Sequence, residues 1–187
     1  KWDGMSIVVT YDRHGNVQRA LTRGDDGLGV DVTRLLAGES HFGGTDFEVE
    51  RFGVKYEVVM SWSAVERMSE DLGKVYKNPR NTVAGIVASD ESASRRQYIT
   101  LVPLDIEWDG CEDDRLARIE FMQRLFQGEF DEDGNRTSPP LFTGNGEQET
   151  PFYWYQIDSW DGGDDFFLLQ EDYDEIHAWR ESDDFDF

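Results

Sequence analysis

The chain contains 187 residues, of which 38% are hydrophobic and 13% aromatic, enough to bury the core of one domain. Its formal net charge of −22 argues against a general nucleic-acid-binding protein, because such proteins neutralise phosphates with Lys and Arg. Cys111 is the only cysteine, which excludes an internal disulfide and a zinc site made of cysteines. The apolar runs are far shorter than a membrane span and no signal peptide begins the chain, so we expect a cytoplasmic protein.

The cationic residues are divided unevenly between lysine and arginine. The lysines are Lys1, Lys55, Lys74 and Lys77, whereas arginine is several-fold commoner and Asp exceeds Glu. An acidic, lysine-poor surface is typical of proteins from very salty cytoplasm, where salt screens the repulsion between like charges. We therefore interpret the net charge as a halophile-like acidic surface, which reflects the solvent and not the ligand.

The first third of the chain predicts a hairpin, a short helix and further strands. Residues 5–23 consist of two strand-like runs around RHGN, a turn signal, and predict a β-hairpin. Residues 30–39 predict a short helix capped by Asp31 or Thr33. Residues 45–62 alternate apolar and polar side chains, as one or two strands do.

The middle of the chain predicts two helices and a strand. Residues 63–73 have a Ser cap, helical spacing of apolar residues and a Gly stop, and so predict a helix. Residues 98–108 predict a strand in which Pro103 marks an edge or a bulge. Residues 111–127 carry a regular apolar stripe and predict the most regular helix of the chain.

The last third is less regular. Residues 128–151 are rich in Gly, Pro and Asn and predict a long inserted loop. Residues 152–160 then predict a strand and residues 172–182 a helix. Together the elements indicate an α+β fold with a mostly antiparallel sheet.

Four stretches indicate the function: KWDG at 1–4, TRGDDGLGVDVT at 22–33, KYEVVM at 55–60 and GKVYKNPRN at 73–81. In this order and spacing they resemble the adenylation domain of the NAD-dependent DNA ligases. That family has a Lys-x-Asp-Gly nucleophile motif, and the stretch at 22–33 matches its second motif without a gap. Departures from the family pattern include Asp26 and Tyr56 in place of Gly and Val30 in place of Glu.

The resemblance implies a nucleotidyltransferase (ATP-grasp-like) α+β fold, with residues 1–187 forming a partial adenylation domain. It also implies self-adenylation with NAD, transfer of AMP to the 5′-phosphate of nicked double-stranded DNA, and nick sealing with Mg²⁺. Other Lys-x-Asp-Gly enzymes, namely ATP-dependent DNA ligases and RNA ligases, remain an alternative. A non-catalytic ligase fragment or binding subunit is a second alternative, which the charge of −22 favours.

The resemblance assigns a role to seven residues. Lys1 is the nucleophile, and Asp3 and Gly4 form the turn that presents it. The residues expected to bind the cofactor are Lys1, Gly4, Arg23, Glu57 and Arg180. Glu57 is also expected to bind the metal, and Arg80 is expected to bind DNA. An unperturbed lysine is protonated at neutral pH, so its surroundings must lower its pKa before it can attack a phosphate.

Two of these assignments compete with simpler interpretations. Glu57 could be a strand-edge charge, and Arg80, on the NPRN segment read as a loop, could cap a turn at Asn78-Pro79. The last eight residues, 180–187, match the family only up to the point before its final lysine motif. We therefore expect this chain alone not to self-adenylate, and we expect the remaining ligase domains or a separate ligase subunit as partners.

Overall fold

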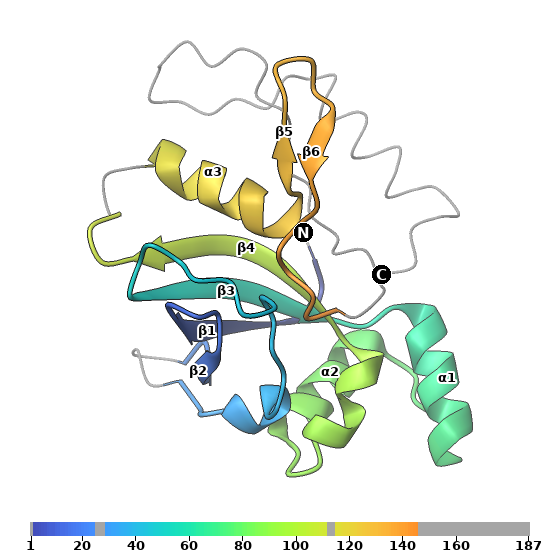
Figure 1. Cartoon of the computed structure of the whole chain (residues 1–187). Coiled ribbons are helices and arrows are strands. Elements are labelled where there is room, and N and C mark those ends of the chain that lie inside the picture. Colours follow the sequence, from blue (N-terminus) through green and yellow to red (C-terminus); the bar gives the residue numbers. More distant parts are fainter. Residues whose placement is uncertain (1, 25–28, 112–114, 146–187) are drawn as a thin grey trace.

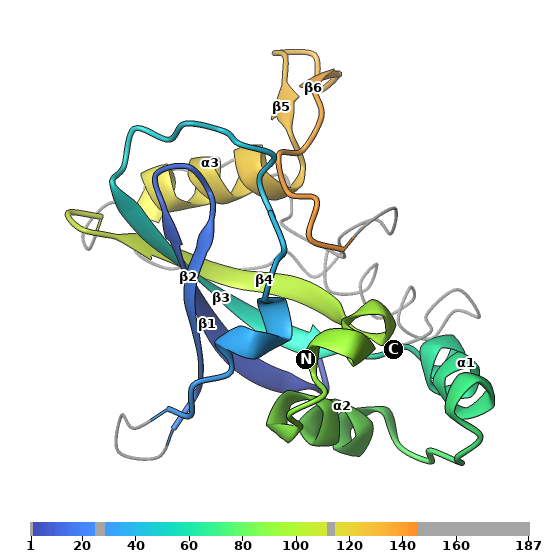
Figure 2. The ribbon, with the colours of Figure 1, turned by 60° about the horizontal axis from the view of Figure 1, so that its bottom comes forward.

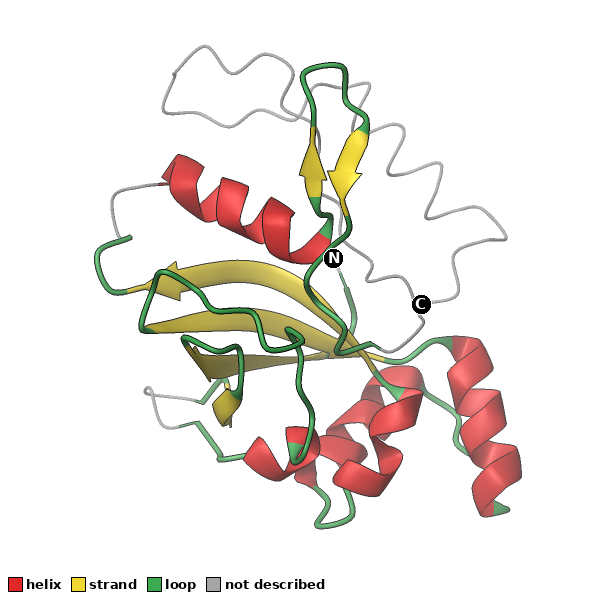
Figure 3. Cartoon of the chain, viewed as in Figure 1, coloured by secondary structure: helices red, strands yellow, loops and turns green. Residues whose placement is uncertain are grey.

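The computed structural model describes residues 2–24, 29–111 and 115–145. Its centre is a four-stranded antiparallel sheet in the order β2-β1-β3-β4 (Figure 1). The strands are β1 (Met5–Asp12), β2 (Val17–Thr22), β3 (Arg51–Val59) and β4 (Thr100–Trp108). The helices are η2 (Thr33–Leu36), α1 (Trp62–Leu72), α2 (Pro79–Ala88), η3 (Ala93–Tyr98) and α3 (Arg115–Phe126). Figure 3 shows this mixture of helix and antiparallel sheet, which confirms the predicted α+β class.

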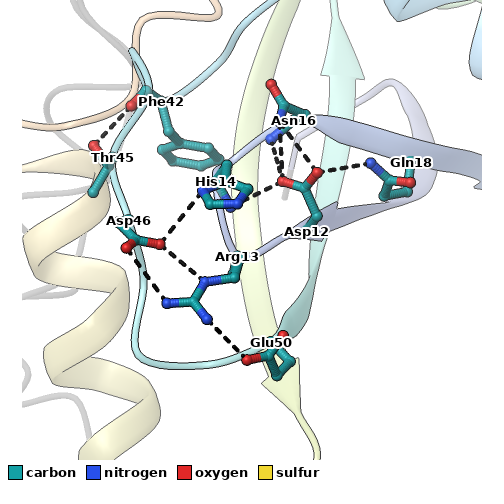
Figure 4. A network of polar contacts seen from close by, with 9 residues as sticks. All are labelled: Asp12, Arg13, His14, Asn16, Gln18, Phe42, Thr45, Asp46 and Glu50. Carbon is teal, nitrogen blue, oxygen red and sulfur yellow. Dashed lines mark hydrogen bonds and ion pairs between the residues drawn. The ribbon is translucent and has the colours of Figure 1, made fainter.

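The predicted hairpin is confirmed as β1 and β2, and its turn is tied to a distant loop. The carboxylate of Asp12 accepts the backbone N–H groups of His14 and Asn16 at 2.9 and 3.0 Å (Figure 4). Desolvation raises the pKa of the Asp12 carboxyl, but the hydrogen bonds outweigh it. The pKa of Asp12 therefore lies below its ordinary value. Arg13 pairs with Asp46 at 3.0 Å, which fastens the turn to the segment that precedes β3. That segment is not a strand, so the predicted strand region 45–62 contains one strand only.

One face of the sheet carries the core. Along β1 the side chains of Ile7, Val9 and Tyr11 are completely buried, as strand alternation requires. Helix α3 covers this face, where Phe121 contacts Phe52 with ring centroids 5.5 Å apart. In Figure 1 α3 lies along β4, whereas η2 lies near β2 and α2 near β1 and β3. Residues from all these elements belong to one hydrophobic cluster.

A buried polar chain runs through this aromatic core. The hydroxyl of Tyr11 lies 2.6 Å from Nδ1 of His41 and 3.0 Å from the hydroxyl of Tyr56. The other ring nitrogen of His41 lies 2.8 Å from Glu39, which Arg96 also contacts at 3.2 Å. Tyr56, which stands where the resembling family has Gly, is therefore a core residue whose hydroxyl belongs to this chain of contacts.

Helices α1 and α2 lie side by side at one end of the sheet, as the turned view in Figure 2 shows. Helix α1 confirms the predicted helix at 63–73, but its N-cap is Ser61, whose Oγ accepts the N–H of Ala64. The αL conformation of Gly73 ends it. Helix α2 was not predicted, and the reading of NPRN as a loop is wrong. Asn78 is its N-cap and Pro79 its first residue.

The end of the described chain corrects one expectation. Within the predicted loop at 128–151, β5 (Glu129–Phe130) and β6 (Arg136–Ser138) form a small hairpin. The side-chain amide of Asn145 then pairs with Leu101 of β4, accepting its N–H at 2.9 Å and donating to its carbonyl at 3.0 Å. The strand predicted at 152–160 and the helix predicted at 172–182 lie outside the described residues.

The strand predicted at 98–108 is confirmed as β4. Its pairing with β3 shifts register between Lys55 and Tyr56, opposite Pro103, which confirms the predicted irregularity. Helix α3 confirms most of the helix predicted at 111–127. Met122 and Leu125 in its C-terminal half are buried, as the apolar stripe predicts, but Leu116 near its start is 47% exposed, so the stripe does not hold there.

Candidate functional site

The strand register places the start of β1 beside the end of β3. Ser6 lies directly opposite Glu57 in the antiparallel pair. Oε1 of Glu57 accepts the backbone N–H of Gly4 at 3.2 Å, and Oε2 accepts the hydroxyl of Ser6 at 2.5 Å. Because Glu57 is only 9% exposed, these two donors offset part of the cost of burying its carboxylate. The carboxylate is therefore held in place against the turn that precedes β1.

Gly4 is required by the close approach of this turn to β3. A Cβ atom at position 4 would lie 2.1 Å from the carbonyl oxygen of Val58. No side chain fits this space without movement of the strand backbone. The glycine of the KWDG motif thus has a steric reason, which EWDG at 107–110 does not share, since Gly110 has open space around its Cβ position.

The N-terminus of α2 brings a cation to the same turn. Nη1 of Arg80 lies 2.9 Å from Oδ1 of Asp3. The backbone that carries Arg80 is fixed because the side chain of Asn78 accepts the N–H of Asn81 at 2.9 Å. In the NPRN segment, Asn78 and Pro79 therefore start the helix, and Arg80 extends from its first turn.

The residue that directly follows β2 also reaches the site. Arg23 follows β2, and its backbone N–H donates to the carbonyl of Ser6 at 3.2 Å. Its side chain is exposed. Gly29, after the undescribed residues 25–28, returns so closely that a Cβ there would lie 2.1 Å from the carbonyl oxygen of Thr22. The TRGDDGLG segment thus leaves and rejoins β2 at the same place.

Most of the predicted site residues that the structure describes are joined by direct hydrogen bonds. Asp3 contacts Arg80, and Gly4 contacts Glu57. Arg23 joins them only through the backbone of Ser6. Two predicted residues, Lys1 and Arg180, lie outside the described residues.

Ser6 is a site residue that the sequence analysis missed. It is the one hydroxyl in the otherwise apolar run MSIVV and sits two positions after Gly4. Strand alternation puts it on the face opposite Ile7, which is buried in the core. A hydroxyl on the face opposite the core, two positions after Gly4, is the sequence feature that could have identified Ser6 as a site residue.

A cationic groove lies next to Arg80. It has a volume of about 520 Å³ and is lined by α1, α2 and residues 74–78 between them. Its lining includes Lys74, Lys77 and Arg95 and, among the described residues, no carboxylate. Arg95 pairs with Glu91, so Lys74 and Lys77 are the lining cations of this groove that form no ion pair within the described part of a chain of net charge −22.

The described residues contain no group of three or more His, Cys, Asp or Glu side chains placed to hold a metal ion. Both oxygens of Glu57 already accept hydrogen bonds from protein donors. A carboxylate has about four lone-pair directions, so this one retains the capacity to accept from a water or a hydroxyl. The arrangement suits an outer contact with a hydrated cation better than direct ligation.

In the described part of the chain, no helix is long and apolar enough to cross a membrane.

Comparison with known proteins points in one direction. A family profile described as "NAD-dependent DNA ligase adenylation domain" matches residues 1–132. The DNA ligase of Flavobacterium psychrophilum is 38% identical over 101 residues, about half of this chain and 15% of that protein. The DNA ligase of Thermodesulfovibrio yellowstonii is 29% identical over 141 residues, 70% of this chain and 20% of that protein. The chain thus spans a fifth or less of the length of these relatives.

Proposed function

Because the chain belongs to the family of NAD-dependent DNA ligase adenylation domains, we propose that it is the catalytic core of an NAD-dependent DNA ligase. The Nζ amine of Lys1 attacks the α-phosphate of NAD, an N–P bond forms, and nicotinamide mononucleotide leaves with the bridging oxygen. AMP then passes from Lys1 to the 5′-phosphate at a nick, and the adjacent 3′-hydroxyl displaces it to seal the strand. The attacking amine must be neutral, so its surroundings must lower its pKa.

The observation that carries this proposal is the contact between Glu57 and Gly4. It fixes an acceptor with spare lone pairs beside the motif that contains the nucleophile. Such an acceptor suits a ribose hydroxyl of the bound nucleotide, and Arg23 at the neighbouring strand end suits a ribose oxygen or a phosphate. Antiparallel strands that converge on this motif support the nucleotidyltransferase (ATP-grasp-like) fold for the domain, with Arg180 as a further contact to the nucleotide.

The DNA side of the proposal rests on α2. The guanidinium of Arg80 is exposed beside the nucleophile motif and matches the geometry of a phosphate. The groove lined by Lys74 and Lys77 lies along the same helix and offers further cations to the duplex beside the nick. A local cationic surface on an acidic protein directs the phosphate backbone to one place.

Mg²⁺ fits this site as an ion carried by the phosphates of NAD. Hard cations of this kind keep several water ligands and bind mainly through substrate phosphates. Glu57 would contact a water of the hydrated ion, since its own oxygens are engaged. When bound, the ion supplies charge neutralisation at the phosphate under attack. A cytoplasmic location follows from the same proposal, because NAD and nicked DNA meet in that compartment. The same proposal implies the remaining ligase domains as partners.

The test uses the protein encoded by the complete reading frame that contains this chain. It is incubated with NAD labelled in the AMP phosphate and, separately, with α-labelled ATP. We expect label from NAD only, on the peptide that carries Lys1, and none after Lys1→Ala. Label from ATP only would overturn the NAD assignment, and nick sealing by the Lys1→Ala variant would overturn the catalytic role.

A further inference from the structure

Asp3 and Arg80 belong to different motifs and form an ion pair. Their ion pair spans 77 positions of sequence and joins Oδ1 to Nη1 at 2.9 Å. The side chains are 71% and 62% exposed, respectively. An exposed ion pair contributes little to stability, so a stronger anion can replace the carboxylate without unfolding any element.

We propose that Asp3 and a phosphate of the nicked strand compete for Arg80. This inference rests on the proposed function, which supplies the phosphate. Before DNA binds, Arg80 is a positioning residue that holds the carboxylate of Asp3. When DNA binds, the guanidinium turns to the phosphate, whose oxygens it contacts in a bidentate manner, and Asp3 is released.

Release of Asp3 from Arg80 affects the KWDG motif because Asp3 directly precedes Gly4. Gly4 is held on one side by Glu57 and approaches the carbonyl of Val58 too closely to shift far. A change at Asp3 is therefore transmitted toward Trp2 and Lys1, the two residues that precede it in the motif. The pair therefore couples DNA binding to the turn that presents Lys1. In the reaction with NAD, Asp3 is held by Arg80, whereas in the transfer of AMP to DNA it is released.

A double-mutant cycle on DNA affinity tests this competition. The affinity of the complete protein for a nicked duplex with a 5′-phosphate is measured at fixed salt. The proteins compared are the wild type, Asp3→Asn, Arg80→Gln and the double variant. Asp3→Asn removes the competitor, so it should tighten binding by about two- to fivefold, the factor that the loss of one exposed ion pair allows. A gain of affinity cannot arise from misfolding.

Removal of any negative charge favours DNA binding slightly, so the cycle needs a matched control. Glu66→Gln removes the same charge from an exposed position on the neighbouring helix α1. We expect Asp3→Asn to exceed Glu66→Gln in the wild-type background and to equal it in the Arg80→Gln background. An equal effect of Asp3→Asn in both backgrounds, or no tightening at all, overturns the competition while leaving the proposed function intact. Failure of every variant and of the wild type to bind the nicked duplex overturns both.

Discussion

Glu57 accepts the backbone N–H of Gly4 at 3.2 Å and so ties β3 to the turn in front of β1. The two residues are 53 positions apart and come from different motifs. Ser6 completes the arrangement from the facing position of β1, at 2.5 Å from the second carboxylate oxygen. One carboxylate therefore holds the KWDG turn and, under the proposed function, also accepts from the nucleotide, which makes it the most informative residue to alter.

Glu57→Gln replaces one acceptor oxygen by an amide that faces a donor. We expect a loss of about 1–3 kcal/mol in the free energy of unfolding, the cost of leaving one buried polar group without a partner. Labelling of Lys1 by NAD in the complete protein should fall by about 10²-fold, as when one oriented polar group is lost from other active sites. Urea denaturation and rapid-quench labelling measure the two effects.

Lys55→Gln is the matched control for Glu57→Gln, since Lys55 is exposed two positions earlier on the same strand. It should change the unfolding free energy by less than about 0.5 kcal/mol. A Glu57→Gln protein with wild-type stability and wild-type labelling would show that the contact to Gly4 has no consequence.

Gly4→Ala tests the close approach of the turn to β3. The added Cβ would lie 2.1 Å from the carbonyl oxygen of Val58, so the turn or the strand must move. We expect a loss of about 1–3 kcal/mol in thermal or chemical unfolding, the usual cost of inserting a methyl group into an occupied space. Gly85→Ala is the control, because it adds the same group inside α2 with nothing within 4 Å. That variant should be more stable than the wild type by about 0.5–1 kcal/mol, and equal effects at both positions would refute the steric argument.

The sequence predicts those parts of the fold whose signals are local. Alternation around RHGN is enough to define β1 and β2, and the Gly stop is enough to end α1 at Gly73. Helix α2 was missed because Asn78-Pro79 is as typical of a turn as of a helix start, and only the packing of Val83 and Ile86 in the core decides. The pairing of Ser6 with Glu57 depends on strand register over 51 positions, which no local pattern encodes.

His41 is expected to be a major determinant of stability, although it lies outside the site. It is fully buried, with Tyr11 at 2.6 Å on one ring nitrogen and Glu39 at 2.8 Å on the other. His41→Leu leaves the Tyr11 hydroxyl and the Glu39 carboxylate without this partner, so we expect a loss of about 3–5 kcal/mol. His14→Leu, at an exposed histidine in the hairpin turn, should stay within about 0.5 kcal/mol. A small effect at His41 would mean that the buried chain of contacts does not form.

Glu39 should make stability depend on pH in the acid range. Desolvation raises its pKa, but the hydrogen bond from His41 and the charge of Arg96 outweigh it, so the pKa lies below the ordinary value of 4.5. The unfolded chain then binds the proton more readily than the folded one. The stabilisation from Glu39 is complete above pH 4.5 and is lost as the pH falls through the lowered folded-state pKa.

Urea denaturation across this acid range checks the pH dependence. The free energy of unfolding should fall less steeply with decreasing pH in Glu39→Gln than in the wild type. Glu48→Gln, at an exposed glutamate in the segment before β3, should keep the wild-type slope. If Glu39→Gln and the wild type had identical slopes, Glu39 would not be the group responsible.

Salt should stabilise the chain, because its charge of −22 acts against the compact state. Raising KCl from about 0.1 M to 1 M shortens the Debye length from about 10 Å to 3 Å and screens that repulsion. Exposed pairs such as Arg13–Asp46 weaken at the same time, but each contributes little. The midpoint of thermal unfolding is therefore expected to rise with KCl, and a midpoint that falls would exclude the halophile-like interpretation.

The pairing of Asn145 with Leu101 bears on how the molecule avoids self-association. β4 is the last strand on its side of the described sheet, and an open strand edge is a template on which a second chain can add a strand. The Asn145 amide occupies both backbone groups of Leu101 in the way that a neighbouring peptide unit would. Pro103 offers no N–H two positions later, and Asp105 and Glu107 add negative charge beyond it. Once folded, the domain is thereby protected from edge-to-edge association along β4.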